Sequence, residues 1–172
     1  VLYRVGSRNE AGGKTGDTHL LEHLMVKGSR HYNKALGNSL NSYMERVGAN
    51  FNATTSMDRT NYVGTLGRDA LEGYIAIEAD RMRNLLLRPE DLASEMTLVR
   101  NEYERGENIP FTALFQQVMA PASQAHPPHH PTIGWRSDNQ HAHLDTLRRF
   151  HCPFHWHDNA TVLLVRALRS CP

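Results

Sequence analysis

Apolar and polar residues alternate along the chain with two different periods. Apolar residues recur at helical spacing and predict helices over residues 19–27, 39–47, 68–87, 89–106, 111–119 and 145–151. β-prone residues or period-two alternation predict strands over residues 1–5, 50–56, 60–66 and 159–165, the last of them buried. The two middle strands flank the tight turn Met57-Asp58-Arg59 and form a predicted hairpin. Residues 121–131, rich in proline and histidine, are expected to be irregular.

Local signals mark where several of these helices begin and end. Asp17 or Thr18 is expected to cap the helix over 19–27, because such side chains accept hydrogen bonds from the first backbone amides of a helix. Gly28 is expected to end that helix. Pro89 favours the first position of the helix over 89–106, where its missing N–H has no intrahelical partner to lose.

Composition narrows the class of protein. The chain has 172 residues with no internal repeat and no linker-like stretch, so we expect one domain. Hydrophobic residues make up 40% and charged residues 22%, which is typical of a globular protein. The formal net charge is +1, and no basic run with interleaved aromatics supports nucleic-acid binding. No apolar run approaches the length of a membrane span. Cys152 and Cys171 form neither a disulfide framework nor a C-x-x-C metal motif.

The helix over 19–27 carries the candidate chemistry in the sequence His19-Leu-Leu-Glu22-His23. At about 100° per residue, the three polar side chains lie at roughly 0°, 300° and 40° around the helix and project into one sector. Two imidazoles and a carboxylate that converge in this way suit a hydrolytic zinc site, with two nitrogen ligands and a base for the water. The order H-x-x-E-H is that of the inverzincins. The alternative is an amphipathic helix with surface histidines.

A catalytic zinc ion needs a third protein ligand and an open position. The helix over 89–106 supplies two candidates, Glu95 and Glu102, which are seven residues apart and within roughly 20° of one another on one face. One of them can bind the metal while the other orients a ligand. The alternative is a solvated acidic face of an ordinary surface helix.

Several segments together resemble the pitrilysin/insulinase family of zinc metallopeptidases, and they follow the order of the family over nearly the whole chain. The segments are Y-R-V-G-S (3–7), G-K-T-G (13–16), H-L-L-E-H-L-M (19–25), K-G-S (27–29), N-A-T-T-S-M-D-R-T-N-Y (52–62), E-M-T-L-V-R-N-E-Y (95–103), H-P-T-I-G-W (130–135) and N-A-T-V-L-L-V (159–165). One such segment is a weak signal, whereas the ordered set is specific. Asp17-Thr18 departs from the small or apolar pair that usually precedes the first histidine of the family.

The resemblance implies a role for each residue of the site. His19 and His23 are zinc ligands, Glu102 is the third ligand, and Glu22 is the general base for the water that one Zn²⁺ ion activates. Glu95 matches the acidic partner of the same motif. The implied fold is α+β, an antiparallel sheet with helices packed on one face. The implied function is a zinc-dependent metalloendopeptidase that hydrolyses peptide bonds in unfolded peptides.

The resemblance also implies partners. A peptide substrate is expected to add as an extra strand to the edge formed by Asn52, Ala53 and Thr54. A homologous second half or second subunit is expected to close around it. Residues 1–172 are expected to be one catalytic domain, incomplete at both ends, and we favour a bacterial periplasmic location over an organellar or cytoplasmic one. Two alternatives are a non-catalytic assembly subunit of the same fold and a structural zinc domain, which would need a fourth protein ligand.

Overall fold

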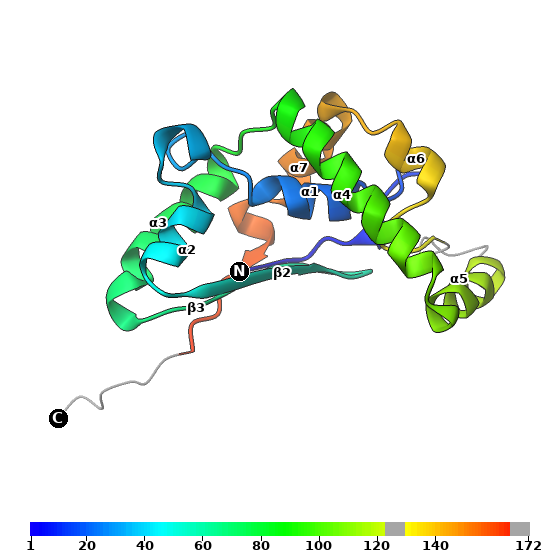
Figure 1. The fold of residues 1–172 in the computed structure, drawn as a ribbon, viewed down its shortest axis with the longest axis horizontal. Helices are drawn as coiled ribbons and strands as arrows, with labels where there is room; N and C mark the ends of the chain where they lie inside the picture. Colours follow the sequence, from blue (N-terminus) through cyan, green and yellow to red (C-terminus); the bar gives the residue numbers. More distant parts are fainter. Residues whose placement is uncertain (123–129, 166–172) are drawn as a thin grey trace.

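A four-stranded antiparallel sheet lies along one side of the molecule, with α1, α4 and α7 above it (Figure 1). The computed structural model describes residues 1–122 and 130–165. Its strands are β1 (Leu2–Tyr3), β2 (Asn50–Thr55), β3 (Thr60–Thr65) and β4 (Ala160–Thr161). Its α-helices are α1 (Asp17–Met25), α2 (Leu40–Arg46), α3 (Leu71–Arg83), α4 (Pro89–Glu107), α5 (Pro110–Ala122), α6 (Arg136–Gln140) and α7 (Leu144–Phe154). Short 3-10 turns lie at Ser7–Asn9, Lys34–Leu36, Arg68–Ala70 and His157–Asn159.

The sheet has the strand order β2-β3-β1-β4, so β2 forms one edge of the described sheet. β2 and β3 make the predicted hairpin, in register from Asn50 opposite Thr65 to Thr55 opposite Thr60. β1 pairs antiparallel with β3 on one side and with β4 on the other. The expected α+β class, an antiparallel sheet with helices packed on it, is confirmed.

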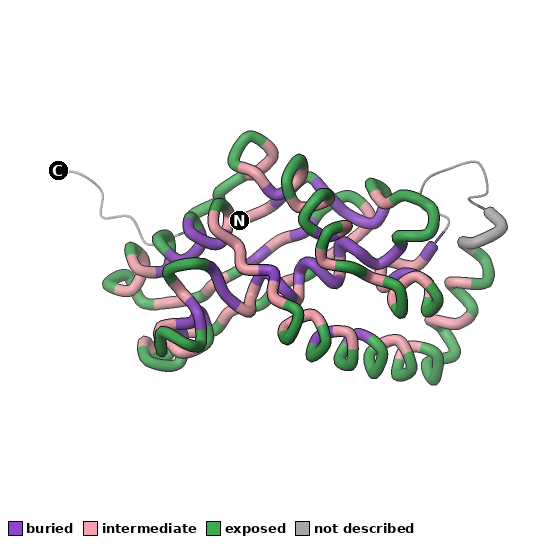
Figure 2. The backbone as a smooth tube through the Cα atoms, turned by 90° about the horizontal axis from the view of Figure 1, so that it is seen from above, coloured by how far each residue is buried: buried purple, intermediate pink, exposed green. Residues whose placement is uncertain are grey.

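Helix α1 is the centre of the core. Leu20, Leu21 and Leu24 pack in one cluster with Leu87, Val99 and Leu147, which come from the loop before α4, from α4 and from α7. Met25 belongs to a second cluster with Tyr3, Val5 and Tyr62 against the sheet. Figure 2 shows the buried residues gathered along the middle of the molecule, with the outward turns of the helices exposed. Burial of α1 on several sides therefore fixes where its polar side chains point.

The start of α1 differs from the prediction that Asp17 or Thr18 caps it. The N-cap is Gly16, whose φ of +91° is readily adopted by glycine. Gly16 has no side chain that could accept a hydrogen bond from the first amides of the helix. Instead the Glu10 carboxylate accepts hydrogen bonds from the amides of Gly16 (2.8 Å) and Thr18 (2.7 Å). The prediction was wrong because the acceptor comes from a loop residue outside the helix.

Two predicted strands are shorter than expected. The first covers Leu2–Tyr3 rather than residues 1–5, and the last covers Ala160–Thr161 rather than 159–165. Val162 to Val165 are exposed rather than buried, because within the described residues no strand pairs with them and no layer covers them. Apolar composition alone cannot show whether a neighbouring strand exists.

The helices agree with the predictions in position but differ at their ends. The segment 68–87 divides into a 3-10 turn, α3 and a loop, because Asn84 leaves the helical conformation after Arg83. Pro89 begins α4 as predicted, and α6 was not predicted at all. Of the segment expected to be irregular, residues 121 and 122 end α5, and 123–129 lie outside the described residues. No helix in the described ranges is both long and apolar enough to cross a bilayer.

Candidate metal centre

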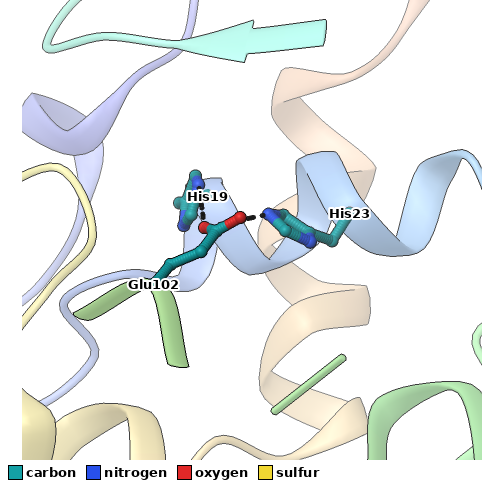
Figure 3. Close-up of side chains that lie close together, drawn as sticks. All are labelled: His19, His23 and Glu102. Atoms are coloured by element: carbon teal, nitrogen blue, oxygen red, sulfur yellow. Dashed lines mark ion pairs between the residues drawn. The ribbon is translucent and has the colours of Figure 1, made fainter. Parts of the chain in front are cut away.

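Three potential metal ligands from two helices converge at one point. His19 and His23 lie one turn apart on α1, with ring centroids 4.7 Å apart at an angle of 75°. Glu102 reaches them from α4, and its Oε2 lies 3.6 Å from the Nε2 atom of each histidine (Figure 3). Ligands about 2.0–2.1 Å from one tetrahedral zinc ion lie about 3.3 Å from each other. The three groups, whose donor atoms lie within 4.8 Å of one another, therefore fit a zinc ion.

The protonation of His19 also suits metal binding. Burial, with a smaller contribution from neighbouring His23, lowers the pKa of His19 from 6.5 to about 4. The ring is therefore neutral at pH 7, and a neutral imidazole has the nitrogen lone pair that a metal ligand requires. Its Nε2 faces Glu102, as the dashed contact in Figure 3 shows.

Glu22 lies in the same cleft as the three potential ligands. Its side chain is buried, and burial raises the pKa of its carboxyl above the ordinary value. The Thr55 hydroxyl donates a hydrogen bond to Glu22 Oε2, which acts on the pKa in the opposite direction. A carboxylate whose pKa is raised toward neutrality is a more effective base than an ordinary surface glutamate.

Glu95 contacts the outer nitrogen of His23. Its Oε2 lies 3.0 Å from His23 Nδ1, and its Oε1 pairs with the Lys27 ammonium. Because a carboxylate accepts and does not donate, His23 donates from Nδ1 and keeps the lone pair on Nε2, the atom that faces Glu102. Spacing alone did not show which of the two glutamates is the metal ligand. In the structure Glu102 lies beside both Nε2 atoms, and Glu95 contacts Nδ1 on the other side of the His23 ring.

The site opens into a cleft of about 480 Å³ between α1, α4 and the edge strand β2. The cleft is lined by His19, Glu22, His23, Val26, Phe51, Asn52, Ala53, Thr54, Thr55 and Glu102. The three residues predicted as a docking strand therefore form part of its wall. The arrangement places a potential metal site, a buried carboxylate and a strand edge around one space.

Sequence reasoning missed the contacts that support α1 from outside the motif. Thr15 Oγ1 donates to Asp138 Oδ2 (2.7 Å) and accepts from the amide of Trp135 (2.8 Å). Gly134, with φ of +82°, packs so closely that an added Cβ would lie 2.3 Å from the Thr15 carbonyl oxygen. The glycine in H-P-T-I-G-W was the available signal, since a glycine can mark a close backbone approach.

Comparison with known families and structures now identifies the type of domain. Residues 1–135 match the family described as Insulinase (Peptidase family M16). The chain belongs to the insulinase family. This insulinase-family chain is 33% identical to the zinc protease PqqE of Helicobacter pylori over 171 residues, 99% of this chain and 38% of the relative. A crystal structure of a protease from Helicobacter pylori matches with a TM-score of 0.85 and 31% identity, over 92% of this chain and 38% of that chain.

Insulinase-family relatives differ in their described roles. Zinc proteases are among them, as the Helicobacter pylori relative shows. Another relative is subunit 1 of the mitochondrial cytochrome b-c1 complex of Rattus norvegicus, 29% identical over 128 residues, 74% of this chain and 26% of the relative. The chain spans less than half the length of these relatives. The family is thus one of zinc metallopeptidases, and its members include a subunit of the cytochrome b-c1 complex.

Proposed function

We propose that this chain provides the catalytic site of a zinc-dependent metalloendopeptidase that hydrolyses peptide bonds in unfolded peptides. His19, His23 and Glu102 would hold one zinc ion. When bound, the ion supplies Lewis-acid polarisation of a carbonyl and lowers the pKa of water to about 7. The observation that carries the proposal is the meeting of these three groups with Glu22 in one cleft beside a strand edge.

Glu22 is the proton-transfer group in this proposal. Its buried carboxylate takes a proton from the attacking water and then delivers a proton to the leaving amine. The Thr55 hydroxyl holds one oxygen of that carboxylate, so the base is oriented before substrate arrives. Glu95 holds the ring of His23 from behind.

The edge strand β2 is the proposed docking site for the peptide. Asn52, Ala53 and Thr54 line the cleft, and β2 has a strand partner on one side in the described sheet. A peptide that adds as a further strand binds through main-chain hydrogen bonds, which gives affinity with little demand on sequence. A homologous second half or second subunit would close over the peptide. Residues 1–172 as a single domain and the periplasmic location stay predictions.

A non-catalytic assembly subunit is the second candidate, since one relative is a subunit of the cytochrome b-c1 complex. A subunit with a purely structural role has no need of a base in a metal cleft. This chain keeps both histidines, Glu102 and a buried Glu22 around one space, which favours the peptidase.

Metal analysis and peptide cleavage test the proposal. We expect about one zinc per chain by mass spectrometry of the purified protein, and loss of zinc in His19→Ala and Glu102→Ala. Glu104→Ala is the matched control, because Glu104 lies on the same helix, is exposed and makes a loose contact (3.8 Å) with Arg136. Glu22→Gln should keep zinc and abolish cleavage by the complete enzyme.

Each outcome has a consequence. Absence of zinc from the unmodified protein after reloading would contradict the metal site. Normal cleavage by Glu22→Gln would show that another group is the base. A zinc-loaded complete protein that cleaves no unfolded peptide would favour the assembly subunit.

A further inference from the structure

Lys27 and His23 contact the two different oxygens of one buried carboxylate. His23 lies in the last turn of α1, and Lys27 lies two residues beyond the end of that helix. The carboxylate is that of Glu95, which faces them from α4. Oε2 of Glu95 contacts His23 Nδ1 at 3.0 Å, while Oε1 pairs with the Lys27 ammonium and accepts from Ser94 Oγ at 3.4 Å. The Glu95 side chain is 3% exposed and that of Lys27 is 32% exposed. A cation at the protein surface thus reaches in to a buried anion.

The buried carboxylate depends on its partners for its position. Removing a carboxylate from water is unfavourable unless the carboxylate is paired and hydrogen-bonded. In the part of the chain the structure describes, Glu95 pairs with the Lys27 ammonium and with the His23 ring. Without the ammonium, Oε1 keeps one long contact to Ser94, and the carboxylate gains by rotating toward water and away from His23.

We propose that Lys27 is a positioning residue of the zinc site. It holds the Glu95 carboxylate against His23 Nδ1, and the imidazole is thereby kept with its Nε2 lone pair facing Glu102. The inference rests on the proposed zinc site and adds a residue to the support of that site.

A simple charge argument gives the opposite expectation. A lysine near a cation site repels the cation, so its removal by that argument alone would tighten zinc binding. Positioning through Glu95 predicts weaker binding when the ammonium is lost. The sign of the change in zinc affinity therefore separates the two roles.

Zinc affinity can be measured by competition with a chromophoric chelator on the chain as it stands. Lys27→Met, which keeps the length of the side chain, should weaken zinc binding about tenfold, the low end for loss of a group that supports a metal ligand. Lys27→Arg should restore affinity to within about threefold of the original. Lys34→Met is the matched control, since Lys34 is exposed in the 3-10 turn Lys34–Leu36, makes no ion pair in the described part of the chain and should change nothing.

A double-mutant cycle tests whether Lys27 acts through Glu95. Glu95→Gln should weaken zinc binding at least as much as Lys27→Met. The double variant should bind zinc no more weakly than Glu95→Gln alone, because the lysine then has no carboxylate to hold. Additive losses would show that Lys27 acts by another route and would overturn the proposal.

A measurement without metal separates this inference from the zinc site itself. Long-range proton–nitrogen spectra of the metal-free protein, with His23 assigned from its Gln variant, report which ring nitrogen carries the proton. We expect Nδ1–H in the unmodified protein and in Lys27→Arg, and a mixture of tautomers in Lys27→Met. Lys27→Gln serves as the second variant if Lys27→Met does not fold. An unchanged tautomer, or unchanged or tighter zinc binding, in Lys27→Met or Lys27→Gln would overturn the proposal. Failure of the original protein to bind zinc would overturn the proposed function instead.

Discussion

Half-buried His151 of α7 and fully buried His155, the residue that follows α7, should make the stability of this domain depend on pH. The rings of His151 and His155 stack with centroids 5.3 Å apart at 2°, and His155 also lies 5.0 Å from the ring of Tyr3. His155 is fully buried, and neither of its ring nitrogens has a hydrogen-bond partner among the described residues. Burial lowers the pKa of His155 from 6.5 to about 3, with added repulsion from His151 and Arg81. Burial lowers the pKa of His151 to about 4.

The size of the effect follows from these pKa values. Below pH 6.5 the unfolded chain takes up protons on both rings, while the folded chain stays neutral there until pH 4 or lower. At pH 5, about 1.5 units below the unfolded pKa, each ring has therefore removed about 2 kcal/mol of folding free energy, at about 1.4 kcal/mol per unit. Stability from each histidine is present above pH 6.5 and is lost as the pH falls.

Two buried acids act in the opposite direction. Burial raises the pKa of Glu10 to about 7 and that of Asp17 to about 6. Folded molecules bind protons on these groups before unfolded ones do, so acidification from pH 7 to pH 5 stabilises the fold through them. The total stability therefore combines opposing contributions, and a difference between variants isolates the histidine.

The assay compares denaturant unfolding of the metal-free protein at pH 7 and pH 5. His155→Phe keeps an aromatic ring beside Tyr3 and has no group to protonate. The loss of unfolding free energy from pH 7 to pH 5 should be about 2 kcal/mol smaller in this variant than in the original protein. His157→Phe, at an exposed position, should behave as the original. The reasoning is refuted if His155→Phe shows the same pH dependence as the unmodified chain.

Three further outcomes are expected. Thr55→Val should lower kcat of the complete peptidase about tenfold with zinc content unchanged, since the base loses one hydrogen bond of about 1–1.5 kcal/mol; Thr55→Ser should recover most of the rate, and equal losses in both would exclude the hydroxyl as the cause. Gly134→Ala should destabilise the fold by more than about 1 kcal/mol in denaturant unfolding, because its φ is +82° and its Cβ would meet the Thr15 carbonyl, whereas Gly12→Ala meets no atom and should stay within about 0.5 kcal/mol. Chelation of zinc should lower the Tm of the original protein and leave that of His19→Ala unchanged, and equal shifts would place the stabilising metal elsewhere.

Each half of the candidate site was predictable from spacing within one helix, and the resemblance to the family linked the two halves. A spacing of four residues places His19 and His23 on the same face of a helix, and a spacing of seven does the same for Glu95 and Glu102. Which glutamate lies nearer the imidazole Nε2 atoms depends on how α4 crosses α1, and spacing within one helix carries no information on that crossing. Contacts of Lys27 with Glu95 and of Thr55 with Glu22 were missed for the same reason.

The fold was predictable where one segment carries both halves of a contact. The hairpin of β2 and β3 is such a case, since a short turn brings its two strands into register. The cap of α1 by Glu10 was not predictable, because it requires a loop to fold back onto the helix. The short length of β4 was not predictable either, because it depends on whether a neighbouring strand exists. Local pattern identifies what a segment can become, and tertiary contacts decide its ends.

Helix α1 has no position that faces solvent freely. Of its 9 residues, those that are buried are Asp17, Thr18, Leu20, Leu21, Glu22, Leu24 and Met25, and the two that remain are His19 and His23. Surface positions are where proteins usually absorb neutral substitutions. Saturation mutagenesis of this helix, scored by peptide cleavage, should therefore find no tolerant site. Family members that do not bind the metal should still keep the apolar residues of α1. Within α1, loss of the metal site is then confined to His19, His23 and Glu22, while the apolar residues of the helix are preserved by the core.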